Sequence, residues 1–225
     1  MMNPTVYVET SVISYLTSRR SKDVEVAAYQ EITQEWWSRA PSRFSLVTSE
    51  LVITEAASGD SDAARARLKV LETVPLVDIT GKAIELNRRL VDLRAVPPTA
   101  ADDAAHIATA ATNGVTYLVT WNFRHIANAT MRPRIEEVCR SSGYEPPVIC
   151  TPRELMETAH SDSTGLAMQA TRTDPIIDEL HSVRDQHAAR FGYDVDAIFR
   201  DIRAREESSG REYLQLPARR VVRSR

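Results

Sequence analysis

The chain has 225 residues, with 28 Lys and Arg against 31 Asp and Glu, which leaves a formal net charge of −3. This balance argues against a surface that holds nucleic acid constitutively through its phosphates, although a nuclease can still let a metal ion bridge an acidic site to a phosphate. The sequence has no apolar run of roughly eighteen residues and no secretory signal, so we expect a cytoplasmic protein without membrane contact.

From Met1 to Thr158, short apolar runs alternate with stretches of helical periodicity. We expect strands at Thr5–Val8, Phe44–Thr48, Leu76–Ile79, Tyr117–Thr120 and Val148–Cys150. We expect helices at Val24–Arg39, Glu50–Ala57, Asp60–Leu71, Lys82–Leu93, Asp103–Asn113 and Arg132–Ser142. The strand candidates are nearly all apolar, which is typical of strands covered on both faces. The pattern predicts an α/β domain over residues 1–158, with a central, mainly parallel sheet flanked by helices.

Beyond this domain the pattern changes. Residues 159–173 have neither periodicity nor bulk and are interpreted as a linker. Residues 174–225 form a predominantly helical tail, in which a first helix begins at Asp174-Pro175 and a second one follows Asp194. The apolar positions expected on their buried faces are Ile176, Leu180, Val183 and Phe191 in the first helix, and Val195, Ile198, Phe199 and Ile202 in the second. Glu212–Leu216 is expected to be a short extended piece, and the helices are expected to dock on the preceding domain.

Polar residues follow several of the predicted strands. Glu9 directly follows the first strand, Asn122 follows the fourth, and Glu55 and Asp103 lie on helices near the same sheet edge. Open parallel sheets place their sites at the carboxyl ends of strands. Gathered carboxylates repel one another unless a cation lies between them, and oxygen ligands suit Mg²⁺ or Mn²⁺. We therefore expect these four residues to form a metal site that is also catalytic.

At these positions the chain resembles the PIN-domain ribonucleases. The four segments that carry the resemblance are Val6-Tyr7-Val8-Glu9-Thr10-Ser11, Ser49 to Glu55, Ala101 to Ala111, and Tyr117 to Asn122. Their order and spacing match from about Thr5 to Thr158, and the phrase from Glu9 to Thr17 is similar to one branch of VapC-like toxins of type II toxin–antitoxin systems. The resemblance implies Mg²⁺- or Mn²⁺-dependent RNA hydrolysis that leaves a 5′-phosphate, and a homodimer. Glu9 and Asn122 stand where the family usually has Asp, which implies weaker metal binding or a single ion.

Other interpretations of these residues stay open. Glu9 and Asp103 are also plausible helix caps, and for Asp102 the cap is the favoured role. Glu50 is interpreted as facing solvent or capping its helix, and His106 and His125 as packing or hydrogen-bonding histidines rather than general bases. Arg19, Arg20 and Arg124 are candidates for guiding an RNA backbone.

The tail resembles short antitoxin-like proteins that accompany this branch of PIN toxins. This suggests a toxin fused to its own inhibitor, in which Arg211, Arg219 or Arg220 neutralises the carboxylates in place of metal. The alternative is a helical layer that only stabilises the fold or a dimer. We expect no specific DNA binding by the tail.

Two further classes of function compete with the nuclease. One is a non-catalytic PIN-like module that binds RNA or protein and has a decayed metal site, which Asn122 and the absence of a basic surface favour. The other is a different nucleotide or phosphate-ester enzyme. The chain has only 7 glycines and no GxGxxG or GxxxxGK[ST] motif, which makes a dinucleotide or P-loop site improbable.

Overall fold

The computed structural model describes residues 3–156 and 174–221. The elements in chain order are β1 (Thr5–Val8), α1 (Thr10–Thr17), α2 (Val24–Arg43), β2 (Ser45–Ser49), α3 (Glu50–Ala56), α4 (Ser61–Leu71), β3 (Leu76–Val77), α5 (Gly81–Asp92), a 3₁₀ turn η1 (Pro98–Ala100), α6 (Ala101–Thr112), β4 (Tyr117–Val119), α7 (Arg132–Ser141), β5 (Val148–Cys150), α8 (Pro152–Met156), α9 (Pro175–Arg190), α10 (Val195–Ser209) and β6 (Tyr213–Leu214). The predicted linker at 159–173 lies outside the described residues.

The strands form one six-stranded sheet in the order β5-β4-β1-β2-β3-β6, and every pairing is parallel. β1 is central, with β2 on one side and β4 on the other. The chain runs outward from β1 through β2 and β3, and then returns to the opposite side of β1 for β4. This reversal makes the carboxyl ends of β1 and β4 the topological switch point, where open α/β sheets bind their ligands.

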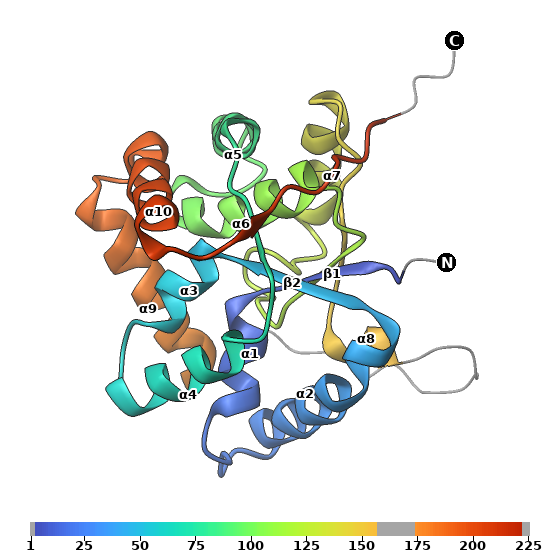
Figure 1. Ribbon diagram of the computed structural model, residues 1–225, viewed down its shortest axis with the longest axis vertical. Helices are drawn as coiled ribbons and strands as arrows, with labels where there is room; N and C mark the ends of the chain where they lie inside the picture. Colours follow the sequence, from blue (N-terminus) through green and yellow to red (C-terminus); the bar gives the residue numbers. More distant parts are fainter. Residues whose placement is uncertain (1–2, 157–173, 222–225) are drawn as a thin grey trace.

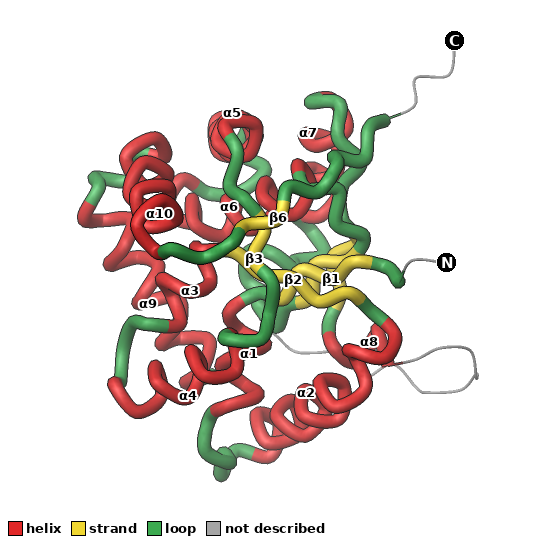
Figure 2. The backbone as a smooth tube through the Cα atoms, in the orientation of Figure 1, coloured by secondary structure: helices red, strands yellow, loops and turns green. Residues whose placement is uncertain are grey.

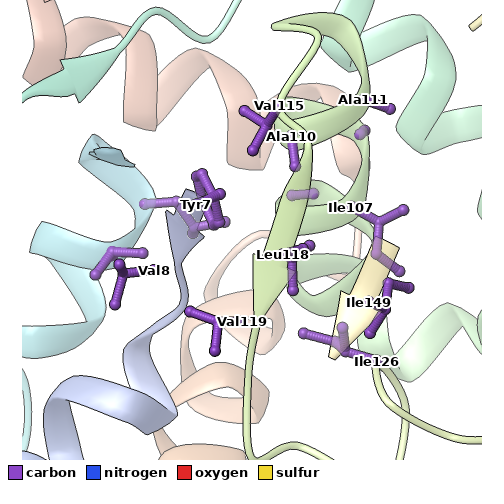
Figure 3. Packing of buried hydrophobic residues seen from close by; sticks show 14 of the residues in the cluster. Tyr7, Val8, Ile107, Ala110, Ala111, Val115, Leu118, Val119, Ile126 and Ile149 are labelled. Carbon is purple, nitrogen blue, oxygen red and sulfur yellow. The ribbon is translucent and has the colours of Figure 1, made fainter. Parts of the chain in front are cut away.

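Helices cover both faces of the sheet (Figure 1). α5, α6 and α7 lie on one side, and α1, α2 and α8 on the other, while α9 lies beyond the end of the sheet at which β1 stops. The core between the sheet and α6 is tight because that helix presents alanines to β4. Figure 3 shows Ala110 and Ala111 of α6 near Val115, with Ile107 close to Leu118 and Ile149, and these side chains are all at most 4% exposed.

The predicted α/β architecture with a parallel sheet is confirmed. All five predicted strands are found, each displaced by at most two residues at an end, and so are the six predicted helices of this part of the chain. α2 continues through Pro41 to Arg43, past the predicted end at Arg39. α1 was not among the six helices predicted from periodicity, but the alternative in which Glu9 caps a helix is confirmed. α1 begins immediately after Glu9, whose side chain accepts a hydrogen bond from the Ser11 N–H.

The tail contains the two predicted helices and the predicted extended piece. α9 and α10 are the two expected helices, and the expected extended piece is β6, which pairs with β3 and completes the sheet (Figure 2). A backbone hydrogen bond from Asp78 N to Leu214 O, 3.0 Å long, continues this pairing. β6 thereby covers β3, which would otherwise be an edge strand. Among residues 3–156 and 174–221, no helix combines the length and apolar character that crossing a membrane requires.

Candidate functional site

Four predicted site residues meet at the switch point. Glu9 follows β1, Glu55 lies on α3 behind β2, Asp103 is in the first turn of α6, and Asn122 follows β4. All four are at most 3% exposed. Their convergence from four segments follows from the topology, because parallel strands end at the same edge of the sheet. Glu9 also caps α1, so capping and membership of the cluster coexist in one side chain.

The centre of the cluster holds Arg184, which comes from α9 in the tail. Its Nε donates to Glu55 Oε1 at 2.7 Å and its Nη2 to Glu55 Oε2 at 3.0 Å. Its Nη1 donates to Asp103 Oδ1, and its Nη2 also donates to Glu9 Oε1. The Arg184 side chain is only 5% exposed. One guanidinium therefore joins three carboxyl groups from three segments of the first 156 residues.

The electrostatics of the cluster depend on this arginine. Burial alone would raise the pKa of Glu55, but Arg184 and then His106 outweigh burial and hold that pKa well below its ordinary range. Burial of Asp103 is likewise outweighed, chiefly by Arg184, so its pKa is lowered. Burial would lower the pKa of Arg184, but the carboxylates raise it well above its ordinary value. The charged forms thus stabilise one another although they are buried.

Hydroxyl groups next to the acids fix the carboxylate orientations. Thr10 Oγ1 donates to Glu55 Oε2, and Thr120 Oγ1 donates to Glu9 Oε2 at 2.7 Å. Ser11 Oγ also donates to Glu9 and accepts the Trp121 N–H at 2.8 Å. These hydroxyls explain why the chain needs Thr and Ser after Glu9. The hydrogen bonds hold the Glu9 side chain in one rotamer. Its conformational entropy is therefore already lost before any ligand binds.

His106 connects the cluster to the core, as a hydrogen-bonding histidine rather than a surface base. Its Nδ1 lies 2.9 Å from Tyr7 Oη, and its Nε2 lies 3.1 Å from Glu55 Oε1 and 3.0 Å from Arg184 Nη2. These two contacts place opposite demands on Nε2, which donates to a carboxylate but must accept from a guanidinium. The displacement of Arg184 would let His106 donate to Glu55 without conflict.

Asn122 is already committed within the protein. Its Nδ2 donates to Asp103 Oδ1 at 2.8 Å, and its Oδ1 accepts the His125 N–H at 3.1 Å. His125 Nδ1 lies 2.7 Å from Asp103 Oδ2. Asn122 therefore orients Asp103 through its amide nitrogen, while its amide oxygen is bonded to the backbone of His125.

A second tail residue meets an acid that was given a different role. Asp102 was expected to cap its helix, but α6 begins at Ala101 and Asp102 Oδ2 instead lies 3.0 Å from His187 Nδ1 of α9. Burial raises the pKa of Asp102 against the opposing effect of His187. Burial would lower the pKa of His187, but its hydrogen bond to Asp102 raises it. Asp102 thus contributes to tail docking.

Glu50 was expected to face solvent or cap its helix. It is 6% exposed and accepts a hydrogen bond from Tyr213 Oη of β6 at 2.8 Å. The expectation is wrong because the tail, which the sequence places far away, covers this side of α3.

The arginine expected to neutralise the carboxylates was also assigned to the wrong positions. Arg211 lines a groove beside Glu72 and Thr73, the Arg219 carbonyl accepts from Glu145 N at 2.8 Å, and Arg220 lies over the Tyr144 ring at 4.4 Å. None of the three reaches the carboxylates, because the end of the tail runs along β3 and past α7. Arg184 was missed because the helical pattern does not distinguish a buried arginine from an exposed one; in the structure, the buried positions of α9 are Leu180, Arg184, His187 and Ala188.

The three arginines proposed to guide RNA are all on the surface. Arg19, Arg20 and Arg124 are exposed, and Arg20 forms an ion pair with Glu31 at 2.7 Å. Their exposure is compatible with contacts to a phosphate backbone, and that role stays a prediction.

The donor set of the cluster fits a divalent cation. Ligand atoms of Glu9, Glu55 and His106 lie within 4.8 Å of one another, and Asp103 reaches the same guanidinium. The Arg184 guanidinium shows that this position stabilises positive charge among oxygen ligands. A metal ion and Arg184 would compete for it, because both need the same carboxylate oxygens.

Comparison of the chain with protein-family models, curated proteins and solved structures finds no match.

Proposed function

We propose that the chain is a PIN-like, metal-dependent ribonuclease, a VapC-like toxin whose own antitoxin-like tail holds it in an inhibited state. The observation that carries this proposal is the burial of Arg184 of the tail among Glu9, Glu55 and Asp103. Burying a carboxylate costs free energy unless the carboxylate is paired. Three buried carboxylates at a switch point are therefore expected where a cation binds among them. A structural ion pair needs only one acid.

Different residues would bind the metal, orient the carboxylates and contact the RNA. Glu9, Glu55 and Asp103 would hold Mg²⁺ or Mn²⁺, with the Asn122 oxygen at the side of the site. The ion, when bound, would stabilise charge on the phosphate and acidify a water molecule. Thr10, Ser11 and Thr120 keep the carboxylates oriented. His106 would donate to Glu55, and exposed Arg19, Arg20 and Arg124 would contact the RNA backbone.

The tail supplies the inhibition. The Arg184 guanidinium makes charge-assisted hydrogen bonds with the oxygens that an ion would need, so the ion and the tail exclude each other. Because α9 belongs to the same chain, docking is intramolecular and needs no high protein concentration. The dimer that the resemblance implies remains a prediction.

The test uses the full chain, because β6 of the tail completes the sheet. Arg184→Ala should cleave mixed-sequence RNA with Mn²⁺ or Mg²⁺, EDTA should stop the cleavage, and the unaltered chain should cleave weakly. Adding Asp103→Asn to Arg184→Ala should abolish cleavage with little effect on folding, because Asn has nearly the same shape. Full activity in that double variant would show that Asp103 is not catalytic.

A non-catalytic module is the second candidate. It is favoured by one observation: both polar atoms of the Asn122 side chain are already bonded within the protein, to Asp103 and to the His125 N–H. If this candidate holds, Arg184→Ala will be inactive at every metal concentration. Adding Asn122→Asp to it would restore a carboxylate, and activity that appears only then would identify a decayed nuclease site.

A further inference from the structure

A second group of ligating side chains lies beside the carboxylate cluster. Asp103, His125 and His181 each offer an atom within 4.8 Å of the others. His125 Nδ1 is 2.7 Å from Asp103 Oδ2, and the two imidazole rings are 5.3 Å apart between centroids. His181 Nε2 also lies 3.4 Å from Asn122 Oδ1. Two imidazoles and one carboxylate therefore lie close together, with the Asn122 amide oxygen beside His181, at the contact between α9 and the carboxyl end of the sheet.

We propose that Asp103, His125 and His181 form a binding site for Zn²⁺ that joins the tail to the rest of the protein. Imidazole nitrogen combined with a carboxylate suits zinc, whereas Mg²⁺ prefers oxygen ligands alone. Three protein ligands leave a fourth position for water. This ion is chemically distinct from the one proposed for Glu9 and Glu55.

The zinc site can be occupied while Arg184 stays in place, because Asp103 uses its two oxygens separately. Oδ1 receives hydrogen bonds from Arg184 and Asn122, while Oδ2 faces His125. Zinc at Oδ2 therefore does not need the position of the guanidinium. An ion can also reach the site from solvent, since the His125 side chain is 19% exposed and His181 is half-buried.

The zinc ligands come from two parts of the chain, so zinc binding is coupled to docking of α9. Asp103 and His125 belong to the first part of the chain, but His181 is one helical turn before Arg184 on α9. The complete ligand set exists only while α9 is docked, so zinc favours the docked state by mass action. At a zinc concentration about one hundred times the dissociation constant, docking is favoured about 100-fold. That zinc would reinforce inhibition rests on the proposed function, whereas zinc binding does not.

The experiment is a calorimetric titration of the full chain with Zn²⁺, in the presence of excess Mg²⁺ and without RNA. We expect one ion per chain. His125→Ala and His181→Ala should each weaken binding by about 100-fold or more, since even outer-shell changes cost about 10- to 100-fold. Gln186→Ala, an exposed position on the same helix, is the matched control and should bind as the unaltered chain does.

Several results would overturn the proposal. Unchanged affinity in His181→Ala would show that the tail contributes no ligand, and the three groups would then form only a hydrogen-bonded contact. Loss of binding in Glu55→Gln, with binding retained in His181→Ala, would place the ion in the carboxylate cluster. If a histidine variant does not fold, X-ray absorption of the zinc-loaded unaltered chain decides, because two imidazole ligands are expected and an oxygen-only shell refutes the site. An inactive Arg184→Ala variant together with His181-dependent zinc binding would defeat the proposed function alone.

Discussion

Replacing Arg184 by alanine removes the guanidinium that α9 places among Glu9, Glu55 and Asp103. The carboxyl groups stay buried as long as the tail stays docked, but they lose their cation. Removing one partner of a buried ion pair costs about 3–5 kcal/mol. At about 1.4 kcal/mol for each factor of ten, the docking equilibrium of α9 falls by roughly 100- to 4000-fold. Under the proposed function, a divalent cation binds the freed carboxylates and shifts the equilibrium further toward the open state.

Mn²⁺ binding followed by electron paramagnetic resonance gives the most direct assay, since it needs no knowledge of the RNA substrate. Arg184→Ala should bind Mn²⁺ at lower concentration than the unaltered chain, and should cleave RNA over the same range of metal. Arg184→Lys should fall between the two, because an ammonium group keeps the charge but cannot match several carboxylates with a planar fork. Hydrogen exchange should report faster opening of α9 in both variants.

The matched control is Arg190→Ala, which removes an exposed arginine from the last turn of the same helix. It should leave metal binding, RNA cleavage and exchange of α9 almost unchanged. Arg184→Ala would contradict a metal site beneath Arg184 if it binds Mn²⁺ no better than Arg190→Ala while both variants remain folded by circular dichroism. That result would mean that the carboxylates form a structural network without affinity for metal.

Two other predictions concern the contacts of the tail. Burial raises the pKa of Glu206 to about 7 from an ordinary 4.5, and Glu206 accepts the Ile79 N–H at 3.1 Å. The folded state therefore holds a proton that the unfolded state has lost, so this contribution to stability is present below pH 4.5 and disappears as the pH rises through about 7. Glu206→Gln keeps the acceptor and should raise thermal stability at about pH 8 by several degrees, with little change at about pH 5; an equal change at both values would contradict the assignment. Gly114 has a φ of +59°, and an added Cβ would lie 2.2 Å from the Pro217 carbonyl oxygen. Gly114→Ala should lower the melting temperature and speed amide exchange at Glu145, which bonds to Arg219, without activating RNA cleavage; normal exchange there would show that this contact does not anchor the tail.

The sheet and its site edge were predictable from sequence because their signals are local. An apolar run such as Thr5–Val8, followed at once by Glu9, places a carboxylate at a strand end whatever the rest of the chain does. Asn122 likewise follows a strand, and Glu55 and Asp103 lie on helices near the same edge, so the alternating pattern gathers all four at one edge of one parallel sheet. The Ser11 hydroxyl is equally local because it bonds to Glu9 two residues earlier, whereas the Thr10 hydroxyl bonds to Glu55 on α3, a contact that the local pattern does not predict.

The role of the tail depends on non-local contacts, and there the predictions were weaker. Arg184 and His187 lie on the helix face that also carries Leu180, and an amphipathic pattern gives no means of telling a docked charge from a solvated one. A buried arginine is only tolerated where carboxylates await it, and that condition belongs to the partner surface. Tyr213–Leu214 was expected to be extended, but its pairing with β3 could not be derived from either segment alone.

Two parts of the tail are held by different kinds of contact. The segment from Tyr213 to Arg220 is held by backbone pairing with β3, by the Glu145–Arg219 hydrogen bond and by the Arg220–Tyr144 stacking, and none of these contacts involves the carboxylate cluster. α9 is held at the cluster by Arg184 and His187, whose partners are acids. A competing cation weakens only the second set of contacts. Under the proposed function, release of the site would require α9 to move, and β6 could stay in the sheet and keep α9 close enough to dock again when the metal leaves.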